Sequence, residues 1–140
     1  MISPSDVIKL RIPYPDKSAE LAKRTHMYVC AKKHGDDKFL LSCQTFKPHH
    51  ALKRVPKVIL KVDSSDTGHP FKVPTTISCD TFFKVEQIVL PNSLLCNPSS
   101  LNADIFGRLQ QNLQHGPSIT SINSSWLMQV DNEVRRHNTP

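Results

Sequence analysis

The sequence predicts an α+β domain in which a small, strongly bent antiparallel sheet or barrel carries attached helices. Short runs of alternating apolar and polar residues occupy about residues 5–90, and apolar residues at helical spacing follow over about residues 99–137. The chain has 140 residues, of which 38% are hydrophobic, so a core can form without disulfides or a metal. We therefore expect one domain over residues 1–140.

The first half of the chain is expected to form short strands joined by turns. A strand over residues 6–13 comes first. Residues 26–31 and 38–45 then flank a turn signal at residues 33–37, an arrangement typical of an antiparallel hairpin. Further strands are expected at residues 55–62, 73–79 and 82–88.

Two helices are expected after the sheet. The first is predicted to begin at Ser99 or Ser100, either of which can cap a helix, and to stop before the Gly-Pro pair at 116–117. The second is predicted to begin near residues 124–125. Each helix has apolar residues three or four positions apart, which predicts one buried face: Leu101, Ile105, Leu109 and Leu113 in the first helix, and Leu127, Val130 and Val134 in the second.

Positive charge is concentrated in the first half of the chain. Residues 1–60 contain twelve Lys and Arg against five Asp and Glu, a net charge of +7. Residues 61–140 contain six against seven, a net charge of −1. A basic face of this kind favours a polyanionic partner that presents phosphate groups. From charge alone, a solvated basic surface without a ligand is the alternative.

The cysteines and the absence of several motifs exclude further classes of function. The four cysteines are far apart and form no C-x-x-C pair, which argues against a zinc knuckle and predicts buried free thiols in a reducing cytoplasm. The first residues do not resemble a signal peptide, and no run approaches the roughly 18 apolar residues of a membrane span. Phosphate-loop, dinucleotide and H-E-x-x-H motifs do not occur. We therefore expect a cytoplasmic protein with no membrane contact, cofactor or metal.

A cluster of polar side chains is expected at the open end of the predicted hairpin. Lys23, Arg24 and His26 lie at the start of its first strand. Thr45 and Lys47 lie at the end of its second strand, which an antiparallel pairing brings to the same place. Cations, an imidazole and a hydroxyl together suit cleavage of a phosphodiester without a metal, since they can stabilise phosphoryl charge and transfer protons. The alternative is a pair of solvated hairpin ends.

The order of several segments matches motifs of one protein family. An opening strand SDVI, an arginine-led strand RTHMYV and a strand LLSCQTFK that contains a threonine occupy residues 5–8, 24–29 and 40–47. A later stretch over residues 76–90 and a closing helix over residues 127–134 follow the same order. In this pattern the chain resembles the toxins of the PemK/MazF family. The likeness covers most of residues 5–90 and the C-terminal helix.

The resemblance implies a fold, an activity and partners. Toxins of this family are SH3-like barrels that form homodimers and are blocked by a cognate antitoxin. They cut single-stranded RNA without a metal and leave a 2′,3′-cyclic phosphate and a 5′-hydroxyl. On matching positions, Arg24 would be the catalytic acid/base and phosphate stabiliser, and Thr45 would hold the scissile phosphate. Lys23, His26 and Lys47 would line the RNA-binding site.

The chain also departs from the family pattern, and two other functions stay open. Thr25 and Cys43 replace prolines, Thr81 and Phe83 replace a glutamine and an arginine, and residues 92–117 are expected to be an added helical segment. A non-catalytic module of the same barrel type could bind nucleic acid or a protein through its basic half. A third possibility is an interaction protein whose helix at 99–114 docks on another chain. Only formation of a cleaved product separates the nuclease from the binding module.

Overall fold

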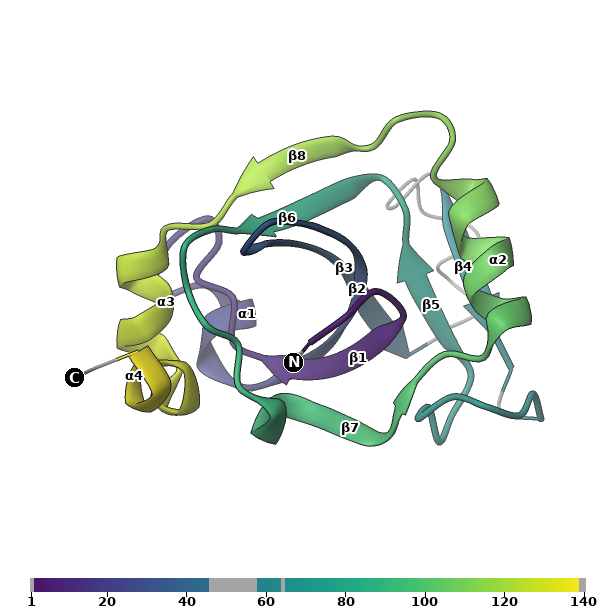
Figure 1. Ribbon diagram of the computed structural model, residues 1–140, viewed down its shortest axis with the longest axis horizontal. Coiled ribbons are helices and arrows are strands. Elements are labelled where there is room, and N and C mark those ends of the chain that lie inside the picture. The colour runs from purple at the N-terminus through teal and green to yellow at the C-terminus, as the bar shows by residue number, and fades with distance from the viewer. Residues whose placement is uncertain (1, 46–57, 64, 139–140) are drawn as a thin grey trace.

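A strongly curled sheet of eight strands forms the centre of the computed structural model, which describes residues 2–45, 58–63 and 65–138 (Figure 1). The predicted α+β class, a small curved sheet with appended helices, is confirmed. No helix in the described ranges has both the length and the apolar character needed to cross a bilayer. The strands are β1 (Asp6–Leu10), β2 (His26–His34), β3 (Asp37–Thr45), β4 (Ile59–Val62), β5 (Thr75–Ser78), β6 (Thr81–Val85), β7 (Leu95–Ser100) and β8 (Ser118–Ser121).

The sheet curls around β3. The hydrogen-bonded order is β4-β5-β3-β2-β1-β7, and β6 joins β3 to β8. One edge of β3 pairs with β2, which confirms the predicted hairpin. The other edge pairs with β6 at residues 38–40 and with β5 at residues 43–45. A strand with different neighbours at its two ends has to bend between them, and an irregularity between Cys30 and Lys32 in β2 adds to the twist.

Two strands lie beyond the predicted sheet core of residues 5–90. β7 pairs antiparallel with β1, and β8 pairs in parallel with β6. β7 does not show the alternation of apolar and polar residues that marks a half-buried strand, because Pro98 and the polar residues Asn97, Ser99 and Ser100 make up most of it. Their pairing is set by neighbours that are distant in the sequence.

The helices are α1 (Glu20–Lys23), α2 (Ala103–Asn112), α3 (Ser124–Val130) and α4 (Asn132–Asn138), with a short 3-10 turn η2 (Asn92–Leu94). The first predicted helix begins later than expected, because Ser99 and Ser100 belong to β7. Asn102 caps α2 instead, and its side chain accepts a hydrogen bond from the backbone N–H of Ile105. The second predicted helix is divided at Asp131 into α3 and α4.

The two faces of the sheet bury separate apolar cores. On β3, Phe39, Leu41 and Cys43 point into the first core, and Leu40 points into the second. Helix α2 covers the first core with Ile105 and Leu109, as the sequence predicted. Helices α3 and α4 cover the second core with Leu127 and Val134, while Val130 is only half-buried. Figure 1 shows α2 and the α3–α4 pair at opposite sides of the curled sheet.

All four cysteines are free thiols and buried, as predicted. Burial raises the pKa of Cys30 to about 11 and that of Cys79 to about 11, from an ordinary value of 9.0. A thiol whose pKa is higher in the folded chain keeps its proton there after the unfolded chain has lost it. Between pH 9 and about 11 the unfolded state therefore binds fewer protons, and stability falls as the pH rises.

We expect the free energy of unfolding to fall by on the order of 1 kcal/mol per pH unit above pH 9. Urea denaturation at pH 8 and at pH 10 measures this change. A variant with Cys30→Ser and Cys79→Ser is the control, because its hydroxyls do not titrate in this range. An equal fall in the variant and the parent would show that other groups cause the pH dependence.

Candidate functional site

A groove of about 880 Å³ opens where the hairpin of β2 and β3 ends. In the described part of the chain, pairing between these strands stops at Tyr28 and Ser42. Beyond that point His26 pairs with Leu10 of β1, and Thr45 pairs with Thr75 of β5. The two strand ends are thus held by different neighbours, and the groove lies between them.

The structure brings the two central predicted residues to this groove. Arg24 and Thr45 both line it, and both are exposed. Arg24 follows α1 directly and has extended backbone angles, φ −150° and ψ 163°, so the chain changes there from helix to strand. A hydrogen bond of 2.9 Å from the Ile12 N–H to the Leu21 carbonyl fixes α1 against the end of β1.

Neither central side chain is engaged elsewhere in the described residues. No carboxylate lies within ion-pair distance of the Arg24 guanidinium there, and the Thr45 hydroxyl has no hydrogen-bond partner there. The neighbouring Thr75 hydroxyl, by contrast, donates to the Val73 carbonyl at 2.9 Å. Within the described residues, the guanidinium and the Thr45 hydroxyl therefore line the groove without a protein partner.

The other predicted site residues differ in their placement. His26 lines the groove, but its Nε2 atom is buried and lacks a partner among the described residues. The buried Nε2 atom cannot transfer a proton to a ligand in this arrangement. Lys23 is exposed outside the groove, with its Nζ 4.0 Å from Glu20 Oε2. Lys47 lies outside the described residues.

Two groove cations were missed by the sequence analysis. Lys9 of β1 and Lys72 of the loop before β5 are exposed and line the groove with Arg24. None of the described residues that line it is acidic. Three cations without a carboxylate make the groove electropositive, which attracts a polyanion. The sequence could have indicated that Lys9 is exposed, because it lies between the buried residues Ile8 and Leu10 of β1. No comparable sequence pattern indicates that Lys72 reaches the groove.

The loop between β4 and β5 reaches the groove and is fixed by hydrogen bonds. Nδ1 of buried His69 accepts from the Phe71 N–H at 3.0 Å, so its Nε2 carries the proton and donates to the Asp63 carbonyl at 3.1 Å. The Asn102 N–H donates to the Gly68 carbonyl at 2.7 Å. Gly68 has φ +73°, and a Cβ there would lie 2.7 Å from the Asn102 Cβ. Glycine is thus required at this turn.

Comparison with known proteins does not assign the chain to a family. No protein-family model, curated protein or solved structure matches the chain. Within the described residues, no three His, Cys, Asp or Glu side chains gather as a metal site would require. The chemistry of the groove has to be inferred from its own residues.

Proposed function

We propose that this protein is a metal-independent endoribonuclease that cuts single-stranded RNA, and that it is the toxin of a toxin–antitoxin pair. One observation carries the proposal: Arg24, between α1 and β2, and Thr45, at the end of β3, both line the groove and are exposed. The order of motifs that resembles the PemK/MazF toxins supports the same assignment, because Arg24 and Thr45 are the residues that the resemblance selects.

The groove residues suit a transesterification within the RNA. The ribose 2′-oxygen passes its proton to a water molecule and bonds to the adjacent phosphorus, while the bond from phosphorus to the 5′-oxygen breaks and that oxygen takes a proton back from water. The products are a 2′,3′-cyclic phosphate and a 5′-hydroxyl, and no water is consumed. The Arg24 guanidinium would donate paired hydrogen bonds to the phosphoryl oxygens as their charge grows. The Thr45 hydroxyl would hold the phosphate in place.

A cleavage assay tests this proposal. Labelled single-stranded RNA is incubated with the protein in an excess of chelator, and the new ends are analysed. We expect fragments that end in a 2′,3′-cyclic phosphate and begin with a 5′-hydroxyl. Intact RNA, or cleavage that requires an added divalent cation, would contradict the proposal.

Lys9 and Lys72 are expected to bind phosphates on either side of the cleaved bond. Replacing both with glutamine should weaken RNA binding. The plot of the logarithm of the association constant against log salt should become shallower by roughly 1.4, because each phosphate contact on a single strand contributes about −0.7 to its slope. Filter binding at several salt concentrations measures the slope. Lys23→Gln is the control, since Lys23 lies outside the groove. An unchanged slope in the double variant would exclude these phosphate contacts.

The proposed partners follow from the same groove. An antitoxin with an acidic segment would compete with RNA for Lys9, Arg24 and Lys72. The resemblance to the family also favours a cytoplasmic homodimer. Light scattering at several protein concentrations would measure the assembly state directly.

The second candidate function is a non-catalytic module that binds nucleic acid or a protein partner. The buried Nε2 of His26 favours it, because that nitrogen cannot exchange a proton with a ligand in the groove. A guanidinium holds its proton strongly and binds phosphate without reacting. RNA that stays intact while it saturates the groove would support this module.

A further inference from the structure

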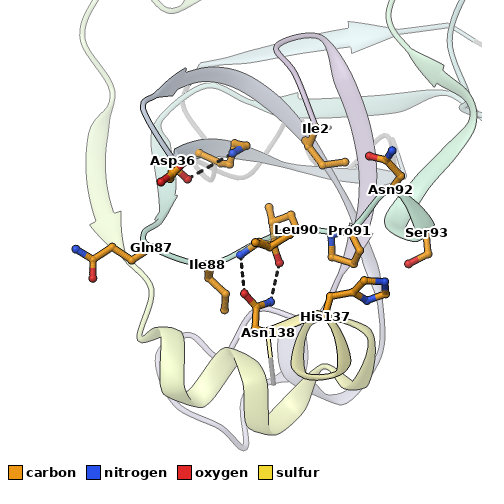
Figure 2. A pocket seen from close by; sticks show the side chains of 12 residues that line it. Ile2, Asp36, Gln87, Ile88, Leu90, Pro91, Asn92, Ser93, His137 and Asn138 are labelled. Atoms are coloured by element: carbon orange, nitrogen blue, oxygen red, sulfur yellow. Dashed lines mark hydrogen bonds between the residues drawn. The ribbon is translucent and has the colours of Figure 1, made fainter. Parts of the chain in front are cut away.

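A second pocket, of about 710 Å³, lies at the other end of β3 from the groove. It is enclosed by the first residues of β3, by the segment of residues 87–93 and by the end of α4. Figure 2 shows Ile88, Leu90 and Pro91 in its middle, with Asp36, Asn92 and His137 around them.

The pocket contains a buried cation. Lys38 is only 8% exposed, and its side chain shares a face of β3 with Leu40, which lies in the second core. Its Nζ donates one long hydrogen bond, 3.4 Å, to the Asp36 carbonyl. Among the described residues no carboxylate lies within 4.0 Å of this ammonium. A buried charge without a counter-ion is costly, and an anion in the pocket would remove much of that cost.

Part of the wall is apolar and held in shape, while polar residues such as Asn92 and His137 line the remainder. Ile2, Ile88 and Leu90 line the pocket and are at most 6% exposed. The Asn138 side chain fixes the segment that contains them, because it accepts from the Val89 N–H at 2.8 Å and donates to the Val89 carbonyl at 2.8 Å. A ligand would meet a preformed apolar surface beside one ammonium.

We propose that this pocket binds a small monocarboxylate with a short apolar body. The carboxylate pairs with the Lys38 ammonium, and the apolar body packs against Ile2 and Leu90. Asp36 lines the rim as an exposed carboxylate and repels the ligand weakly, so a dianion such as inorganic phosphate is disfavoured. This site is independent of the proposed RNA groove.

Titration of the full chain with hexanoate, followed by ¹H–¹⁵N NMR, tests the proposal. We expect shifts confined to the pocket residues and a Kd on the order of 1 mM, as suits a ligand of this size. Hexanamide has the same shape without the charge, and inorganic phosphate has charge without the apolar body. Both compounds should bind at least about tenfold more weakly than hexanoate.

Three variants sharpen the test. Lys38→Met keeps the apolar stem and should weaken hexanoate binding about tenfold or more. Lys32→Met is the matched control, because Lys32 lies on the other face of the hairpin, over the Phe39 and Phe82 rings, and should bind hexanoate like the parent. Asp36→Asn should tighten binding about two- to fivefold.

Several outcomes would overturn the proposal. The first is no shift of the pocket residues at ~10 mM hexanoate. The second is hexanamide or phosphate binding as tightly as hexanoate, which shows that the ammonium or the apolar wall does not contribute. The comparison of ligands uses the parent protein, so it decides the matter even where Lys38→Met does not fold.

Discussion

The Arg24→Ala variant is expected to cleave single-stranded RNA about 10²–10³-fold more slowly than the parent protein, because it lacks the donor that stabilises charge on the phosphoryl oxygens in the transition state. Initial rates on labelled RNA measure the loss. Any contaminating ribonuclease would cut equally in both preparations, so the ratio of the two rates also identifies the source of the activity.

The fold is expected to survive this change. Arg24 is exposed and makes no ion pair with any described residue, so the free energy of unfolding should change by at most about 0.5 kcal/mol. Arg24→Lys is the matched variant, since it keeps the charge but loses the planar fork that binds two phosphoryl oxygens at once. Its rate should lie between those of the parent and Arg24→Ala. A parent-like rate in Arg24→Ala would end the nuclease proposal.

The hairpin that builds the groove could be predicted because its signals are local. The apolar runs on either side of Gly35, and the turn residues between them, predict the two strands of the hairpin. Antiparallel geometry then predicts that Arg24 and Thr45 lie at the same end of the hairpin, and both line the groove there. Lys72 reaches the same groove through the loop between β4 and β5, whose course depends on His69 and on Asn102 of a distant helix. No spacing in the sequence encodes that contact.

The second half of the chain was harder to predict for the same reason. Ser100 and Asn102 are comparable helix caps, so the local sequence does not choose between them. Pairing with β1 decides which residue caps the helix, because Asp6 pairs with Ser100 and Ser100 is therefore part of β7. A tertiary pairing therefore sets where α2 begins, and it also explains why a polar segment with Pro98 belongs to the sheet.

Asp131 is another residue whose role only the structure shows. It is 4% exposed, ends α3 and begins α4. Its Oδ1 accepts from the N–H groups of Glu133 and Val134 at 3.1 and 3.2 Å, and its Oδ2 accepts from the Arg11 N–H at 3.2 Å. One carboxylate thus caps a helix and ties it to the chain segment that leads toward α1 and Arg24.

Asp131→Ala is expected to lower the free energy of unfolding by about 3 kcal/mol, because it removes a helix cap and leaves backbone donors, one of them in the buried residue Val134, without an acceptor. Urea denaturation followed by circular dichroism measures the change. Asp131→Asn separates the two roles: its remaining oxygen can still cap α4, but its amide cannot accept from the Arg11 N–H, so we expect a loss of about 1 kcal/mol. If the alanine variant lost no more than the asparagine variant, the cap on α4 would contribute nothing, and the packing of Leu127 and Val134 alone would hold α3 and α4 on the sheet.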